Sequence, residues 1–224
     1  MTEDFVRDTR AAYDAVAEPY TELFGEELAD NLWDGAFLDA YARIVRGPVL
    51  DVGCGPGRVT AYLDQRGLDV SGVDLSPGMV ATARRAYPEL RFAEGSMTAL
   101  DVPDASLGGV VAWYSVIHVP DDVLPAVLAE FHRVLVPGGH LALAFQVGDE
   151  PHRPAAMFGA PVALTFHRRR PDAVADLLAR AGLPVRVRLV REPEAHPTHT
   201  EQTPQAYLLA RKPTDAGRAA TVTS

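Results

Sequence analysis

Residues 49–57 read VLDVGCGPG. The first four are apolar apart from Asp51, as expected for a strand that is buried on both faces of a parallel sheet. Gly53, Gly55 and Gly57 follow where the chain turns from this strand into a helix. Glycine permits a tight turn and lets the backbone approach a ligand that a side chain would obstruct. Because free N–H groups at the start of the next helix favour an anionic group, the stretch predicts a ligand-binding turn after a central strand.

An acidic residue further along the chain supports the same site. A second strand, DVSGVD, is predicted to end at Asp74, where a carboxylate can accept hydrogen bonds from two ribose hydroxyls. Ser76 can cap a helix that begins at Pro77, so this helix does not need Asp74 as its cap. Dinucleotide-binding dehydrogenases have a third glycine where this chain has Arg58. The spacing therefore disfavours a dinucleotide-binding dehydrogenase.

The pattern downstream predicts an α/β fold. Short apolar runs alternate with amphipathic stretches, which is typical of parallel strands joined by crossover helices. Further strands are predicted at 90–95, 107–116 and 140–147, and a helix is predicted at 121–135.

The two ends of the chain are less regular. A strand is predicted at 162–169 and a helix at 171–182, followed by an antiparallel strand pair at 185–192 and 205–212. Residues 1–46 are predicted to be helical, with interruptions at Pro19 and Gly25. We expect an N-terminal helical cap or lid at 1–46, a core at 47–212 with a substrate-side insertion at 148–170, and a flexible tail at 213–224.

Composition narrows the possible functions. The 224 residues suffice for one α/β domain, which at this size buries roughly 70% of its unfolded surface. A net charge of −9 disfavours nucleic acid as a partner, because binding phosphates requires a basic surface. Cys54 is the one cysteine, which excludes an intramolecular disulfide and favours the cytoplasm. No stretch approaches the ~20 apolar residues that span a bilayer, so we expect no membrane partner.

Five stretches resemble, in order, the motifs of class I (Rossmann-like) S-adenosylmethionine-dependent methyltransferases of the small-molecule type. They are DVGCGPG, GVDLSPGMV, EGSMTAL, VVAWYSVIHV and FHRVLVPGGHLALAF. The resemblance covers about residues 40–147 closely. It implies a doubly wound, mostly parallel sheet of seven strands in the order 3-2-1-4-5-7-6, with strand 7 antiparallel, helices on both faces and an N-terminal helical lid.

The resemblance also implies a cofactor and its binding residues. The cofactor would be S-adenosyl-L-methionine, with S-adenosyl-L-homocysteine as product. Its methionine part would lie against Asp51, Gly53 and Gly55, its ribose at Asp74, and its adenine near Leu75, Met79, Ser96 and Met97, while Trp113 and Tyr114 would face the transferred methyl. Tyr13 and Tyr20 would shield the sulfonium by cation–π contact. The alternatives are that Met97 is an ordinary core residue and that both tyrosines only pack beneath the lid.

Methyl transfer to a small-molecule acceptor would proceed by in-line displacement, in which positioning and exclusion of water matter most. A hydroxyl or ammonium acceptor needs a general base, and His118 at the end of the fourth strand is the candidate. The alternative is that His118 supports the loop before Pro120.

Other histidines and arginines suggest less specific roles. His152, His196 and His199 lack the spacing of metal ligands, so we predict a metal-free site. The run from His167 to Arg170 would either hold an acidic acceptor or form a solvated charged stretch. We expect a monomer or homodimer. The alternative function is a cofactor-binding protein of the same fold with a non-methylating or regulatory role.

Overall fold

The apolar segment before the glycines forms β1 (Val49–Val52), and all four of its residues are buried. β1 pairs in parallel with β2 (Val70–Asp74) on one side and with β4 (Leu107–Trp113) on the other. A strand in this place shows neither face to water, which explains its continuous apolar run.

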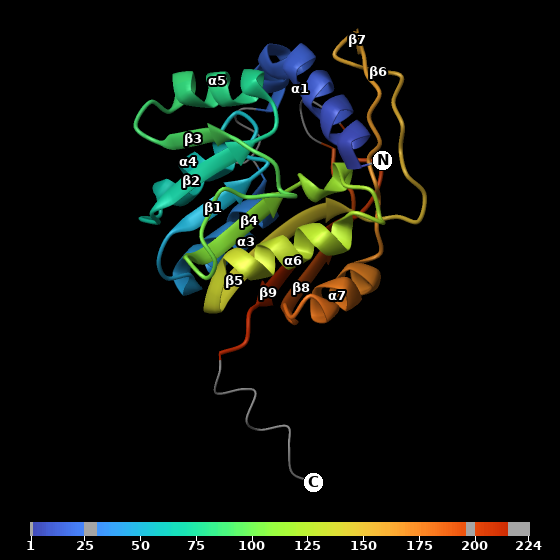
Figure 1. Cartoon of the computed structure of the whole chain (residues 1–224). Coiled ribbons are helices and arrows are strands. Elements are labelled where there is room, and N and C mark those ends of the chain that lie inside the picture. Colours follow the sequence, from blue (N-terminus) through green and yellow to red (C-terminus); the bar gives the residue numbers. More distant parts are fainter. Residues whose placement is uncertain (1, 25–30, 196–199, 215–224) are drawn as a thin grey trace.

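The computed structural model describes residues 2–24, 31–195 and 200–214. Its main sheet has seven strands in the order β3-β2-β1-β4-β5-β9-β8 (Figure 1). β9 is antiparallel to both of its neighbours. The remaining strands are β3 (Arg91–Glu94), β5 (Leu135–Gln146), β8 (Val185–Arg191) and β9 (Gln205–Arg211). The predicted fold class and strand order, including the terminal antiparallel pair, are therefore confirmed.

Helices cover both faces of the sheet. One face packs against α6 (Leu124–Val134) and α7 (Pro171–Arg180), and the other packs against α3 (Leu32–Ile44) and α4 (Arg58–Asp64). α5 (Pro77–Ala86) packs beside β3, and Ser76 caps it as predicted by accepting a hydrogen bond from the Met79 amide. In the part of the chain that the structure describes, no helix is long and apolar enough to cross a bilayer.

The predicted interruption at Pro19 is wrong, because α1 (Thr2–Phe24) is continuous through this residue. Proline lacks the N–H that would complete one turn of the helix. Contacts on both sides of Pro19 compensate for this loss: Asp14 accepts hydrogen bonds from the Ser76 hydroxyl and the Gly78 amide, and the Thr21 hydroxyl bonds to the Ala17 carbonyl. The second predicted break, Gly25, lies outside the described residues.

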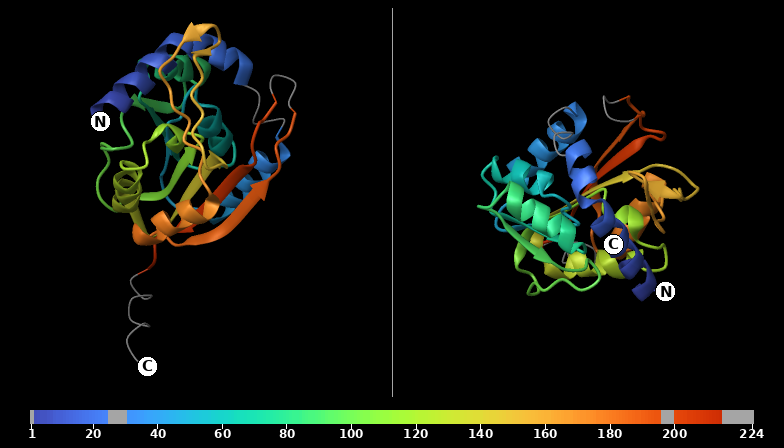
Figure 2. Two further views of the ribbon diagram at one scale, coloured as in Figure 1. Left: turned by 90° about the vertical axis from the view of Figure 1, so that its right-hand side faces the viewer. Right: turned by 90° about the horizontal axis from the view of Figure 1, so that it is seen from above.

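The predicted strand at 162–169 is also wrong. The hydrogen bonds of this segment go to scattered partners, since the His167 amide bonds to Ile117 and the Arg169 amide bonds to Gln146. A single β-bridge joins His152 to Phe166. The preceding residues form a short hairpin of β6 (Ala156–Met157) and β7 (Ala160–Pro161), which the sequence did not indicate. The hairpin lies beside α1, over the end of the sheet where the parallel strands finish (Figures 1 and 2).

Candidate functional site

The turn after β1 has the backbone shape that its glycines permit. Gly53, Gly55 and Gly57 all have positive φ angles, of 75°, 54° and 87°. A Cβ atom added to Gly53 would lie 2.3 Å from the Cβ of Ser115, so packing as well as backbone conformation excludes a larger residue there. A Cβ at Gly55 would meet no other atom within 4 Å. Gly53 therefore maintains the turn, whereas Gly55 faces open space.

Asp74 connects this turn to the start of α5. One carboxylate oxygen accepts a 2.8 Å hydrogen bond from the Gly55 amide, and the other accepts a 2.9 Å bond from the Ser76 amide. Burial raises the pKa of Asp74 above its usual value. A carboxylate offers about four lone-pair positions. The Gly55 and Ser76 amides do not use all of these positions, so Asp74 can still accept a hydrogen bond from a ligand.

A cavity of about 70 Å³ lies against the glycine turn. The structure brings most of the predicted site residues to its wall, from both the sheet and α1. They are Tyr13, Tyr20, Gly53, Gly55, Asp74, Leu75, Met79, Met97, Trp113, Tyr114 and His118. The lining also includes Phe5, Thr9, Gly95, Ser115 and Val119, which the sequence reasoning missed.

Two predicted residues, Asp51 and Ser96, do not line either of the two cavities described here. Asp51 is buried beneath the turn, where one oxygen accepts a 2.7 Å hydrogen bond from the Thr60 hydroxyl. Its Oδ1 atom has no partner among the described residues, and burial raises the pKa of the carboxyl to about 7. The Ser96 hydroxyl bonds to Thr98 at 2.7 Å, while its neighbours in sequence form the wall.

The strand before His118 ends earlier than predicted. β4 stops at Trp113, because Tyr114 takes a φ of 55° and turns the chain out of the ladder. The Ser115 hydroxyl then bonds to the Val52 carbonyl at 2.6 Å and ties the turn to β1. A short 3-10 helix, η1 (Val116–His118), follows and places His118 in the cavity wall.

Both ring nitrogens of His118 have partners. Nδ1 lies 3.2 Å from the Thr165 carbonyl, and Nε2 lies 2.7 Å from the Tyr13 hydroxyl. A carbonyl can only accept, so Nδ1 carries the proton and Nε2 accepts the Tyr13 hydrogen. Burial lowers the pKa of His118 to about 4, so the ring is neutral near pH 7. A neutral ring that already accepts one hydrogen bond is a weak proton acceptor for a substrate.

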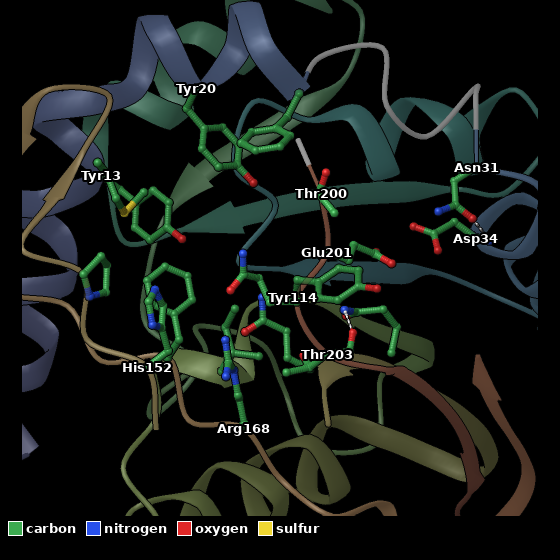
Figure 3. A pocket seen from close by; sticks show the side chains of 18 of the residues that line it. Tyr13, Tyr20, Asn31, Asp34, Tyr114, His152, Arg168, Thr200, Glu201 and Thr203 are labelled. Atoms are coloured by element: carbon green, nitrogen blue, oxygen red, sulfur yellow. Dashed lines mark hydrogen bonds between the residues drawn. The ribbon is translucent and has the colours of Figure 1, made fainter. Parts of the chain in front are cut away.

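A larger cavity, the outer chamber, adjoins the first and has a volume of about 490 Å³. Tyr13, Tyr20 and Tyr114 line both spaces. Aromatic rings on α1 and the β6–β7 hairpin form one side of the chamber: the Tyr20 ring lies 4.8 Å from Phe24 and 6.2 Å from Phe158, between centroids. Figure 3 shows Tyr20 on one side of this space and Arg168 on the other.

A buried polar chain forms another side of the outer chamber. Asp34 accepts hydrogen bonds from the Trp113 indole and the Tyr207 hydroxyl. Arg191 donates to the same Tyr207 oxygen at 2.8 Å and forms an ion pair with Glu201. Sequence reasoning did not find Asp34, Arg191 or Glu201, because they come from distant segments and show no common spacing.

A glycine turn after the central strand, an acidic residue at the end of the next strand and two adjoining cavities define a Rossmann-like nucleoside-binding fold with room for a second molecule. Residues 49–139 match the family described as "Methyltransferase domain". This match agrees with the sequence motifs, and the chain has the Rossmann-like fold of a solved methyltransferase.

Known proteins resemble the chain beyond this segment. Demethylmenaquinone methyltransferase from Beutenbergia cavernae is 37% identical over 140 residues, which are 61% of this chain and 57% of the relative. Trans-aconitate 2-methyltransferase from Escherichia coli is 32% identical over 151 residues, 61% of this chain and 56% of the relative. The chain thus spans just over half the length of these curated relatives.

A solved structure matches almost the whole chain. It is Burkholderia thailandensis 1,6-didemethyltoxoflavin-N1-methyltransferase, with bound 1,6-didemethyltoxoflavin and S-adenosylhomocysteine. The TM-score is 0.75 at 22% identity, and the match covers 95% of this chain and 91% of the other. At this identity the match supports the fold and not the substrate.

Proposed function

We propose that the chain transfers a methyl group from S-adenosylmethionine to a small molecule and releases S-adenosylhomocysteine. The observation that carries the proposal is the pair of adjoining cavities. One borders the glycine turn and Asp74, and the other is large enough for an acceptor, since small-molecule sites commonly measure about 300–1,000 Å³. The three tyrosines that line both spaces stand where the two molecules would meet.

The residues of the smaller cavity fit the cofactor. Asp74 retains acceptor positions for ribose hydroxyls, and Gly55 leaves open space beside the turn. We assign the methionine part to the backbone of Gly53 and Gly55, and the adenine to the apolar side chains of Leu75, Met79 and Met97. Asp51 would act from below by fixing the turn through Thr60 rather than by reaching the cofactor directly.

The chemistry requires positioning above all. When bound, the cofactor supplies a sulfonium methyl that bonds to the acceptor while the carbon–sulfur bond breaks and its electron pair stays on sulfur. The leaving group therefore needs no further activation. The aromatic rings of Tyr13, Tyr20 and Tyr114 exclude water and can stabilise the sulfonium by cation–π contact. His118 would act as a positioning residue that holds the Tyr13 hydroxyl through Nε2.

The N-terminal helix would serve as a lid. The free volume of the smaller cavity, about 70 Å³, is well below that of sites for drug-sized ligands, and α1 contributes Phe5, Thr9, Tyr13 and Tyr20 to its wall. We therefore propose that α1 moves outward to admit the cofactor and closes afterwards. The acidic charge of the chain supports a small acceptor rather than nucleic acid, and its single cysteine supports a cytoplasmic setting.

Binding and turnover test the proposal separately. Calorimetric titration should show binding of S-adenosylmethionine and S-adenosylhomocysteine but not NAD. Incubation with methyl-labelled cofactor and a metabolite extract, followed by mass spectrometry, should then reveal a labelled product. Binding of NAD alone would refute the function. Cofactor binding without transfer to any acceptor would favour the regulatory or non-methylating alternative.

A further inference from the structure

Three consecutive arginines before α7 lie in three different environments. Arg170 is exposed, and its Nε atom lies 3.3 Å from an Asp149 carboxylate oxygen. Arg169 is buried and donates hydrogen bonds to the Asp121 carboxylate and to the backbone carbonyls of Val116 and Val119, at the two ends of η1. Arg168 lines the outer chamber. The run is therefore neither a uniform solvated stretch nor a uniform binding patch.

Arg168 has hydrogen-bond donors without partners in the described part of the chain. Its Nε atom is buried without a hydrogen-bond partner, and no hydrogen bond or ion pair joins its guanidinium to another described residue. Gly148 accommodates the side chain, because a Cβ atom there would lie 3.0 Å from the Arg168 Cβ and 3.2 Å from its Cδ. Figure 3 shows the Arg168 side chain directed into the chamber, opposite Tyr20.

The other charged groups of the outer chamber are already engaged. Arg191 and Glu201 neutralise each other, and Asp34 accepts from Tyr207 and Trp113. Arg58 donates to the Phe24 carbonyl at 3.4 Å. The positive charge of Arg168 thus has no counter-charge within ion-pair distance in the described part of the chain. Leaving the buried Nε donor of a charged group unpaired is costly, so an arginine in such a place favours a ligand that supplies acceptors.

The shape of the chamber narrows the ligand class. A guanidinium is planar and matches the two oxygens of a carboxylate in a bidentate fork. The aromatic side formed by Tyr20, Phe24 and Phe158 suits a flat, apolar ring. A ligand that satisfies both sides carries a carboxylate at one end of a planar body.

We propose that Arg168 is a specificity-determining residue that binds the carboxylate of a planar aromatic acceptor. The inference rests on the proposed methyl transfer, and it assigns the outer chamber to aromatic carboxylic acids. The acceptor's ring lies against the aromatic cluster, and its carboxylate lies on the guanidinium.

Matched probes test the assignment. Benzoate and 2-naphthoate, each beside its neutral amide, are titrated by NMR into the full chain with and without S-adenosylhomocysteine. The wild type should bind each carboxylate on the order of tenfold more tightly than its amide, the factor that corresponds to about 1.4 kcal/mol. Arg168→Met should abolish the preference without weakening amide binding, and Arg168→Lys should retain part of it, because lysine keeps the charge but loses the fork.

Arg170→Met is the control, since it removes a neighbouring positive charge that lies outside the chamber. It should leave the preference unchanged. Equal affinity for carboxylate and amide in the wild type, no binding by either carboxylate, or an equal loss in both methionine variants would overturn the assignment. If S-adenosylhomocysteine fails to bind the wild type, the methyltransferase proposal fails, while the titrations without it still decide the role of Arg168. Thermal unfolding of each variant excludes misfolding, and Arg168→Lys stands in if Arg168→Met does not fold.

Discussion

The two cavities are built in different ways. Apart from its roof on α1, the smaller one is lined by residues between 53 and 119 in and beside the turns that follow β1 to β4, and the backbone of Gly53, Gly55 and Gly95 forms part of its wall. The outer chamber is assembled from side chains of distant segments: α1, the start of α3 and of α4, the turn after β4, residues 146–168, Arg191 and residues 200–205. The shape of a turn depends on residues close in sequence, so we call the smaller cavity the backbone-built site. The outer chamber depends instead on which side chains the tertiary fold brings together. Substitutions at the turns of the smaller cavity should therefore be poorly tolerated, whereas substitutions in the outer chamber should alter which substrate binds.

The most damaging expected change is Gly53→Ala. The new Cβ would clash with Ser115 and the residue would keep a positive φ angle, which together cost about 3–5 kcal/mol of folding free energy. Gly55→Ala is the matched variant: its Cβ meets nothing, so folding should lose only about 1 kcal/mol while cofactor affinity falls sharply.

Urea unfolding and calorimetry separate these two glycine effects. Gly55→Ala that binds the cofactor normally would show that the ligand does not approach this turn. Gly53→Ala with unchanged stability would show that Ser115 can move aside, and the turn would then be less rigid than its geometry indicates.

The second prediction concerns His118, which supports the roof of the smaller cavity. Burial is the main reason that its pKa is lowered from 6.5 to about 4, and the nearby charges of His167 and Arg169 contribute to the same shift. Because the unfolded chain binds more protons in this range, the stability that neutral His118 contributes is present above pH 6.5 and lost as the pH falls towards 4. At about 1.4 kcal/mol per unit of pKa, the loss amounts to about 3 kcal/mol.

Asp51 complicates the direct measurement, because burial raises its pKa to about 7 and its contribution is lost as the pH rises instead. The comparison of wild type with His118→Asn removes this effect, since both proteins contain Asp51. Their difference in unfolding free energy should shrink by about 3 kcal/mol between pH 6.5 and 4. A constant difference would mean that His118 is not buried as the neutral ring.

Sequence patterns were sufficient where neighbouring residues decide the structure. The turn after β1 depends on glycine conformations, and the cap of α5 depends on the Ser76 hydroxyl. The β8–β9 pair depends on two segments rich in apolar residues that lie close together in the sequence. The family resemblance then supplied the strand order.

Tertiary contacts explain what the sequence did not indicate. Pro19 remains helical because α1 packs against α5. The segment 162–169 forms no strand because the amides of His167 and Arg169 bond to two different elements, η1 and β5. The polar chain from Asp34 to Glu201 joins residues far apart in sequence, and it has no local signature. For the same reason, the three arginines could not be told apart without their surroundings.

The third prediction tests the carboxylate in the backbone-built site. Asp74→Asn should weaken cofactor binding by about 2 kcal/mol, because charge-assisted hydrogen bonds to ribose hydroxyls become neutral ones. Asp69→Asn is the control, since Asp69 forms an exposed ion pair with Arg91 and should bind the cofactor like the wild type. Equal calorimetric affinities in all three proteins would place the ribose elsewhere.

The smallest expected effect comes from Tyr13→Phe, at the boundary between the two cavities. The substitution keeps the ring but leaves the buried Nε2 atom of His118 without its donor, which should cost about 1 kcal/mol of stability. Turnover per folded molecule should stay within several-fold of the wild type, because positioning alone can drive displacement from a sulfonium. If the Tyr13–His118 pair instead removes the acceptor's proton, turnover should fall by about 10²–10⁴-fold, and the loss should shrink as rising pH ionises the acceptor. The pH–rate profiles of the wild type and Tyr13→Phe, each normalised to the amount of folded protein, distinguish these outcomes. Coincident profiles would confine both residues to holding the roof in place.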